Sequence, residues 1–462
     1  MGIVNAIYEN SPIPLQSCML SLYGVYLDRL RYGKTFREAL AEVKLLDRLS
    51  RPEIERWQSE TLRSVIDGAL KRSPYYANKY SHLRDSLPQI NSHNLGKFFP
   101  LLTKECVRSE MELFYARESG VRYSCINTSG STGSPLAVLT TQKSVSKNYA
   151  FFESFLNAHG VSYRDKSATF AGRMIIPPQQ SGPPYWRRNF AQNTWLMSSY
   201  HLSDETCSEY VRFLGSLRPV FIDSYPSAVT TLARFINRNK IAHEIRPKVI
   251  VTSSESLTDV ARQEIEQAFQ CKVADQYGNA EMAGFIAQCE YGSYHANPFY
   301  GLMEVVDPDG NPVPPGTVGN LALTGFVNPS MPLIRYLIGD SVVLSETGCQ
   351  CGRAFPIVKE IMGRTDDLIV LADGRRIGRM DPLFKGLDGL SEAQIIQREL
   401  DEFEVRVVYA SESVNRQEIA QKLSSAIRSR LNADVNIVVT QVSNIEKGAN
   451  GKFKSVVSLV KQ

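Results

Sequence analysis

The stretch "PVFIDSYPSAVTTLARFINRNKIAHEIRPKVIVTSSESLTDVARQEIEQAF", residues 219–269, decides the fold class. Two short apolar runs, 219–225 and 248–254, are typical of buried strands. Each run is followed by an amphipathic segment, 227–239 and 258–269, whose apolar residues recur at helical spacing. Strand and helix alternating in this way predict an α/β fold with a largely parallel, helix-covered sheet.

On either side of this stretch the sequence shows different patterns of residue types. The chain has 462 residues, which is too long for a single compact core. The first part reads as mainly helical, and Pro, Gly and Asp turns later separate short strands. Near the C-terminus the chain restarts with a hairpin, followed by strand, helix and strand. We therefore expect an N-terminal domain of residues 1–363, built from a helical part (1–120), an α/β core (121–294) and a β-subdomain (295–363), and a small α+β domain of residues 364–462.

Composition and charge favour a small-molecule substrate. The net charge of +4 is too small to indicate nucleic acid or an acidic membrane as the principal partner. No run approaches the roughly 18 uninterrupted apolar residues of a membrane span, and the first residues lack the pattern of a signal peptide. The eight cysteines are scattered and do not form a disulfide framework, so the expected compartment is the cytoplasm.

The run "TSGSTGSP", 128–135, consists almost wholly of small and hydroxylated residues. The segments on both sides favour strands, so the run is expected to be the loop of a hairpin. It lacks the Gly-Lys-Ser/Thr ending of a P-loop. Its glycines allow successive N–H groups to converge, and its hydroxyls add donors for phosphate oxygens. From the residues alone, a phosphate cradle and an ordinary surface turn both stay open.

Four later motifs narrow this choice because of their order. After "TSGSTGSP" come "DQYGNAE" (275–281), "RYLIGD" (335–340), "GRTDD" (363–367) and "GANGKFKS" (448–455). In this order the five motifs resemble those of the adenylate-forming enzymes, the acyl-CoA synthetases and their relatives. "SYPSAV", "CQCGR", "QIIQ" and "NGKFKSVVS" resemble the phenylacetate–CoA ligase-like branch, which includes CapK-type capsular polysaccharide proteins. The resemblance covers nearly the whole chain.

The resemblance implies a large N-terminal domain, a small mobile C-terminal domain and a ligase reaction in two steps. A carboxylate attacks the α-phosphorus of ATP to give an acyl-adenylate and pyrophosphate. The acyl group then passes to coenzyme A, or to an amine or hydroxyl of a sugar or other small metabolite. The expected partners are the acid and this acceptor, with a homodimer as an open alternative. Because Ala280, Leu337 and Ile338 depart from the family pattern, a catalytically lapsed nucleotide-binding scaffold is the competing interpretation.

The resemblance also assigns roles to individual residues. Glu281 binds Mg²⁺, Lys452 stabilises the transition state from the mobile domain, and Asp366 is the hinge. Tyr277 stacks on adenine, while Asp340 accepts from the ribose hydroxyls with help from Arg364. The other expected ATP-binding residues are Thr128, Ser129, Gly130, Ser131, Thr132 and Gly133 at the phosphates, and Ser254, Glu255, Gly278 and Asn279 around the nucleoside.

The carboxylate pocket is expected between "FAGRMIIPPQQSGPPYWRRN" (170–189) and "DSYPS" (223–227). Phe170, Trp186 and Tyr225 offer aromatic walls there, while Arg173 and Arg187 offer positive charge to a polar substrate. The Pro and Gly content of the first segment is equally compatible with a plain surface loop.

Three cysteines and a histidine suggest a metal site apart from the nucleotide. Cys289 and His295 lie in "CEYGSYH", and Cys349 and Cys351 lie in "CQC". Three thiolates and an imidazole would complete a tetrahedral, structural Zn²⁺ site joining the β-subdomain to the core. The alternative is four unrelated small residues in a β-rich region.

Overall fold

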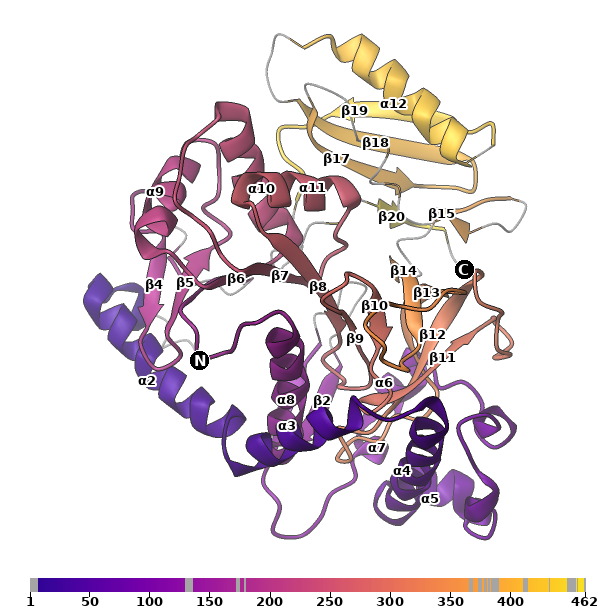
Figure 1. Cartoon of the computed structure of the whole chain (residues 1–462). Helices are drawn as coiled ribbons and strands as arrows, with labels where there is room; N and C mark the ends of the chain where they lie inside the picture. The colour runs from indigo at the N-terminus through magenta and orange to yellow at the C-terminus, as the bar shows by residue number, and fades with distance from the viewer. Residues whose placement is uncertain are drawn as a thin grey trace.

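The structure is a computed structural model. It describes residues 7–128, 136–171, 175–177, 180–364, 369–372, 376–377, 380, 383, 390–409, 414–431, 433–446, 454 and 456–460. Figure 1 shows a large body with a smaller sheet and its helix, coloured from orange to yellow, at one end. None of the helices in these ranges is both long enough and apolar enough to cross a membrane.

Five neighbouring strands of the main sheet run parallel, as the alternation predicts. In sheet order they are β8 (Lys272–Gly278), β7 (Val249–Ser253), β6 (Phe221–Ser224), β3 (Ser167–Ala171) and β5 (Thr194–Ser198). The antiparallel strand β4 (Trp186–Asn189) closes this edge.

Helices cover both faces of these parallel strands. On one face, Ile250 of β7 packs with α9 (Cys207–Leu217), α10 (Pro226–Asn239) and α11 (Asp259–Phe269). On the other face, Val249 and Val251 pack with α8 (Gln142–Ala158). The alternation follows from the two-residue period of a strand, which turns successive side chains to opposite faces. Figure 1 shows α9–α11 and α8 on opposite sides of the sheet.

The β-subdomain is not a separate sheet. Its strands β9 (Phe285–Gln288), β10 (Tyr294–Ala296), β14 (Ile357–Arg364), β13 (Tyr336–Leu344), β12 (Val318–Gly325) and β11 (Gly301–Val306) continue the parallel strands in one sheet of twelve. The junction is the antiparallel pair of β8 and β9, in which Tyr277 lies opposite Ile286. The predicted division at residue 294 therefore falls inside a single hydrogen-bonded sheet.

The N-terminal part is helical, as expected. Its elements are α2 (Ile13–Arg31), α3 (Lys34–Leu46), α4 (Arg51–Arg72), α5 (Pro74–Tyr80), η1 (Ser81–Leu83), η2 (Leu87–Gln89), η3 (Leu95–Lys97), α6 (Lys104–Ser109) and α7 (Met111–Phe114). Helix α4 starts with a capping box, in which the N–H of Ser50 donates to Glu53 at 2.8 Å. After α7 the strands β1 (Tyr123–Asn127) and β2 (Ala137–Thr141) form the predicted hairpin.

The C-terminal part has its own core. The hairpin of β15 (Ile369–Val370) and β16 (Arg376–Ile377) precedes a sheet in the order β19 (Asn436–Gln441), β18 (Glu402–Tyr409), β17 (Leu390–Gln397) and β20 (Val456–Ser458). Helix α12 (Arg416–Leu431) packs Leu423 and Ile427 against Ile395 and Val405 of this sheet. The sequence predicted the hairpin, β18, α12 and β19.

A buried aspartate on β8 gives a pH dependence to stability. Asp275 is 6% exposed and accepts hydrogen bonds from the hydroxyls of Thr252 (2.6 Å) and Tyr294 (2.7 Å). Burial raises the pKa of this carboxyl from 3.8 to about 6, although both hydrogen bonds oppose the rise. The folded chain thus holds this proton more tightly than the unfolded chain does. The stabilising contribution is complete below about pH 4 and is lost as the pH rises through about 6.

We expect Asp275→Asn to abolish the decrease in stability that the Asp275 carboxyl causes as the pH rises. This decrease amounts to about 2–3 kcal/mol between pH 4 and pH 7. Urea unfolding followed at several pH values measures it, with the exposed residue changed in Asp309→Asn as the control. Equal slopes of stability against pH in Asp275→Asn and the unmodified chain would contradict the expectation.

Candidate functional site

The predicted site residues gather at the carboxyl ends of the parallel strands. Tyr277 lies near the end of β8, Ser254 and Glu255 directly follow β7, and Tyr225 directly follows β6. Ligands of open α/β sheets bind at this edge, because the strand ends and the following helix N-termini leave backbone groups free there. The strand order therefore brings together residues up to 52 positions apart in the sequence.

Tyr277 and Asp340 form the centre of this group. The hydroxyl of Tyr277 donates a hydrogen bond to Oδ2 of Asp340 at 2.6 Å. Asp340 lies in β13, directly opposite Arg364 in the antiparallel neighbour β14. Three residues from three separate motifs thus occupy adjacent positions, and Tyr277 and Asp340 are both partly accessible to solvent.

Glu281 projects from a tight turn after β8. The side chain of Asn279 holds this turn, since its Oδ1 accepts from the N–H of Ala283 (2.9 Å) and its Nδ2 donates to the carbonyl of Gly284 (3.1 Å). In the described structure Asn279 is therefore used to shape the turn. The Glu281 carboxylate is 5% exposed and accepts from the hydroxyl of Tyr336 at 3.2 Å.

Electrostatics around Glu281 favour a cation. Burial raises the pKa of its carboxyl, and the nearby carboxylate of Asp340 raises it further, while Lys104 and the Tyr336 hydroxyl lower it. A buried carboxylate with a second acidic group nearby is stabilised by added positive charge. Its hard oxygen donors fit Mg²⁺.

Lys104 is a charged residue near Glu281 that the sequence motifs did not single out. It opens α6, two residues after Leu102, whose N–H and carbonyl pair with β13 on either side of Tyr336. Its position was the available signal. A lysine in the first turn of a helix is unfavourable for the helix dipole, so its presence there indicates a role outside the helix. Here its charge lies close enough to Glu281 to affect the pKa of that carboxyl.

Glu255 and Ser254 form the turn that follows β7. The Glu255 carboxylate accepts from the backbone N–H (2.9 Å) and the hydroxyl (3.1 Å) of Ser227, in the first turn of α10. Ser254 is exposed and has a φ of 71°, a left-handed conformation that is uncommon for a residue with a side chain. The end of β14 approaches the same turn, since a Cβ built at Gly363 would lie 3.7 Å from the hydroxyl of Ser256.

Thr128 closes the base of the β1–β2 hairpin. Its N–H donates to the carbonyl of Leu136, and its Oγ1 accepts from the Leu136 N–H, both at 2.9 Å. Several predicted residues lie outside the described part of the chain: Ser129, Gly130, Ser131, Thr132, Gly133, Arg173, Asp366 and Lys452. The backbone of Arg364 is described, but its side chain is not.

The predicted carboxylate pocket needs correction. Phe170 is 1% exposed and packs against Tyr210 in the core beneath α9, and Trp186 stacks on Phe213 of that helix at 4.0 Å. Both side chains are thus used to attach α9 to the sheet and are not walls of an open pocket. Tyr225 precedes α10 at the carboxyl edge, where its N–H donates to the carbonyl of Phe170 at 3.2 Å.

Arg187 is also committed elsewhere. It is 1% exposed, and its guanidinium donates to Oε1 of Gln16 (2.5 Å), Oε1 of Gln180 (2.8 Å) and the carbonyl of Pro184 (2.9 Å). These bonds tie α2 and the segment before β4 together, so Arg187 is a structural residue and does not bind a substrate carboxylate.

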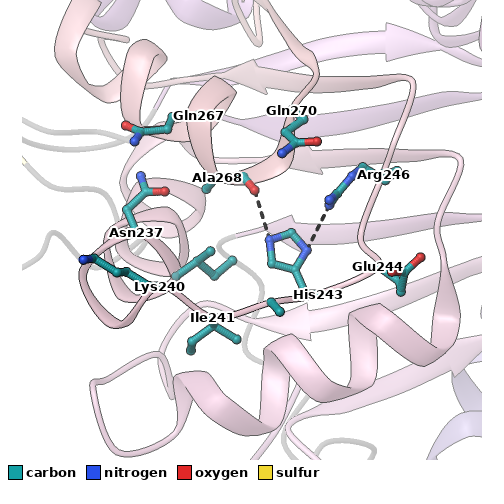
Figure 2. Close-up of a pocket in the computed structure, with 11 residues that line it drawn as sticks. Asn237, Lys240, Ile241, His243, Glu244, Arg246, Gln267, Ala268 and Gln270 are labelled. Carbon is teal, nitrogen blue, oxygen red and sulfur yellow. Dashed lines mark hydrogen bonds between the residues drawn. The ribbon is translucent and has the colours of Figure 1, made fainter.

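A separate hollow of about 580 Å³ lies on the side of the sheet where the parallel strands begin (Figure 2). It is lined by residues at the C-terminal ends of α10 and α11, which run back toward the amino ends of the strands. Its histidine, His243, is engaged through both ring nitrogens: Nε2 with the carbonyl of Ala268 (3.0 Å), and Nδ1 with Arg246 (3.3 Å) and the N–H of Ile245 (3.1 Å). His243 therefore holds the connection between these helices and is not poised for catalysis.

The chain is similar to known proteins over nearly its whole length. The sequence profile of the AMP-binding enzyme family matches residues 123–328, and that of the CapK C-terminal domain matches residues 369–459. Protein CapK of Staphylococcus aureus is 27% identical over 464 residues, covering 99% of this chain and 100% of that protein. A phenylacetate-coenzyme A ligase of Thermus thermophilus is 34% identical over 167 residues, 35% of this chain and 38% of that enzyme.

Solved structures show the same fold. The 2-hydroxyisobutyryl-CoA ligase in its postadenylation state, in complex with R3-HIB-AMP, matches with a TM-score of 0.69 and 20% identity. The match covers 89% of this chain and 90% of that one.

Proposed function

Since the chain belongs to the phenylacetate–CoA ligase-like, CapK-type branch of the adenylate-forming enzymes, we propose that it activates a small carboxylic acid with ATP. The observation that carries this proposal is the contact of Tyr277 with Asp340, opposite Arg364, beside the buried carboxylate of Glu281. The site thus offers an aromatic ring, a ribose acceptor and a cation ligand at one edge of the sheet.

The nucleoside occupies the space around Tyr277 and Asp340. The adenine ring lies against Tyr277, and the ribose hydroxyls donate to the Asp340 carboxylate, which the Tyr277 hydroxyl holds in place at 2.6 Å. The phosphates lie toward the loop that follows Thr128. Ser254 and Glu255 border the base, with Glu255 acting through the turn that it fixes to α10.

Charge neutralisation explains the rest of the site. Glu281 would hold Mg²⁺, which would neutralise the phosphate oxygens that repel an attacking carboxylate. Lys104 adds positive charge near Glu281. Lys452 supplies a cation from the C-terminal domain where negative charge develops in the transition state, and Asp366 lies at the hinge that moves this domain.

The acyl group then passes to coenzyme A or to an amine or hydroxyl of a small metabolite such as a sugar. Of the departures at Leu337 and Ile338, the second has a structural reason, because the Ile338 side chain is 5% exposed and packs in the core. The backbone N–H of Leu337 donates to the carbonyl of Leu102 at 2.9 Å, a bond that does not depend on the side chain at this position. We place the reaction in the cytoplasm, because ATP is available in that compartment.

Carboxylate-dependent exchange of pyrophosphate into ATP tests the proposal, across a panel of aryl, amino and short hydroxy acids. We expect exchange with a restricted set of acids. The active acid is then incubated with coenzyme A or with amine and hydroxyl acceptors, and the product is identified as a thioester, amide or ester by mass spectrometry. ATP binding without exchange for any acid would favour the lapsed scaffold instead.

The Tyr277 hydroxyl gives a specific prediction. Tyr277→Phe removes the bond that orients Asp340, so we expect KM for ATP to rise about 5- to 20-fold with kcat little changed, as for loss of a hydrogen bond to a partly exposed charge. Tyr409→Phe, on the C-terminal sheet, is the matched control. An unchanged KM for ATP in Tyr277→Phe would place the nucleoside elsewhere.

A further inference from the structure

The four predicted metal ligands, Cys289, His295, Cys349 and Cys351, meet in space. One ligand atom from each lies within 4.8 Å of the others, although the two pairs are more than 50 residues apart in the sequence. Cys289 lies in the connection between β9 and β10 and His295 lies in β10 itself, while Cys349 and Cys351 lie in the connection between β13 and β14. Because β10 and β14 are hydrogen-bonded neighbours, these connections lie side by side.

The distances between ligand atoms match those of a tetrahedral zinc site. Zinc–sulfur bonds of about 2.3 Å and zinc–nitrogen bonds of about 2.1 Å put two sulfurs about 3.8 Å apart, and a sulfur and a nitrogen about 3.6 Å apart. The observed separations are 3.6 Å between the sulfurs of Cys289 and Cys349, and 3.4 Å between Cys351 Sγ and His295 Nε2. The first separation is far beyond the 2.05 Å of a disulfide bond.

Both connections share the same backbone design. Each has a cysteine at the start of a tight turn and a glycine three residues later, Cys289 with Gly292 and Cys349 with Gly352. In each turn the glycine N–H donates to the cysteine carbonyl, at 2.8 Å and 3.4 Å. The glycines have φ values of 88° and 75°, in the left-handed region that favours glycine. Each turn thus directs its first cysteine sulfur toward the other turn.

An ion pair spans the two turns beside the cluster. Arg353 donates to Glu290 at 2.8 Å, and it also lies next to Cys351. Three thiolates and one neutral imidazole around Zn²⁺ carry a net charge of −1, which a neighbouring guanidinium stabilises. His295 and Cys289 are 5% and 6% exposed, so the site is largely shielded from solvent.

We propose that Cys289, His295, Cys349 and Cys351 bind one structural Zn²⁺ per chain. With four protein ligands the ion has no open position for substrate, so it does not take part in the adenylation chemistry. It fixes the start of β14, the strand whose far end carries Arg364 opposite Asp340. The ion therefore holds in place one strand of the nucleotide site from a distance.

Metal content of the purified full chain tests this proposal without reference to activity. We expect about one zinc per chain by mass spectrometry, retained through dialysis, and at least a tenfold lower content in Cys349→Ser and Cys351→Ser. Cys125→Ser changes an exposed cysteine outside the cluster and is the matched control. Metal-free chain of native fold, or equal zinc in the cluster variants and the control, would overturn the proposal.

Substitution with Co²⁺ tests the proposal even if the cysteine variants do not fold. Exchange of the unmodified chain with Co²⁺ is expected to give the visible bands of a tetrahedral site and near-ultraviolet thiolate charge transfer. It should also protect three thiols from alkylation relative to the metal-free chain. Octahedral cobalt bands, or the same number of reactive thiols with and without metal, would overturn it. Because these readouts need no substrate, failure of the proposed ligase activity would leave them unaffected.

Discussion

Lys452→Ala is expected to lower carboxylate-dependent ATP–pyrophosphate exchange by about 10²- to 10³-fold, the usual effect of removing one preorganised charge from a transition state. Both reactants of adenylation are anionic, so the largest barrier is the repulsion between the attacking carboxylate and the phosphates. In the proposed mechanism Lys452 supplies positive charge at that point from the C-terminal domain and leaves again for acyl transfer. We expect the loss mainly in kcat, with the KM for ATP changed only a few fold.

A surface lysine of the same domain provides the control for Lys452. Lys422, on α12, forms an exposed ion pair with Glu418 at 2.7 Å, so Lys422→Ala removes the same charge without touching the site. Exchange in that variant should remain within about twofold of the unmodified chain. An exchange rate of Lys452→Ala equal to that of Lys422→Ala would remove Lys452 from the adenylation step. Acyl transfer from preformed acyl-adenylate, measured separately, is expected to be little affected.

Local patterns predicted the elements of this fold well, because apolar periodicity reports directly on which face of a segment is buried. The strands and helices of 219–269 and the β1–β2 hairpin all lie where the sequence places them. What the sequence could not provide was the register between distant segments. Nothing local to β8 indicates that β9 pairs with it and so joins the core and the β-subdomain in one sheet.

The site shows the same division between local and long-range information. The ordered motifs selected Tyr277 and Asp340, and the structure brings them to 2.6 Å. The aromatic residues chosen for the acid pocket were wrong for Phe170 and Trp186, since a large apolar side chain near a site serves the core as readily as a ligand. Arg187 was misassigned because its partners, above all Gln16, are distant in the sequence.

Arg335→Met is expected to destabilise the large domain by about 3–5 kcal/mol, the range found when one partner of a buried ion pair is removed. The side chains of Arg335 and Glu304 are 4% and 14% exposed, and Arg335 Nε lies 3.1 Å and 3.2 Å from the two carboxylate oxygens. The same guanidinium donates to the carbonyls of Phe99 (3.0 Å) and Gly310 (2.7 Å). Methionine replaces the volume but leaves the two carboxylate oxygens and the two carbonyl oxygens without their donor.

The pH dependence of the destabilisation by Arg335→Met shows whether the unpaired Glu304 carboxylate causes it. Burial already raises the pKa of Glu304, which the Arg335 charge opposes, so removing the charge raises that pKa further. The destabilisation by Arg335→Met should therefore be greatest at neutral pH and shrink as Glu304 becomes protonated in acid. Urea unfolding, followed by the fluorescence of the three tryptophans, measures both effects.

An exposed ion pair on the same domain is the control that separates the effect of burial from the effect of removing a charge. Arg234 pairs with Glu264 at 2.8 Å, but these side chains are 53% and 28% exposed, so Arg234→Met should cost less than about 1 kcal/mol at any pH. Adding Glu304→Leu to Arg335→Met removes the stranded carboxylate and should recover part of the lost stability. A loss in Arg335→Met no larger than in Arg234→Met, or no recovery in the double variant, would show that the buried pair does not hold the N-terminal part to β13. In that event the proper placement of Tyr336 and Glu281 would have to depend on the backbone hydrogen bonds of Leu102 and on the apolar contacts of Leu102 and Leu333.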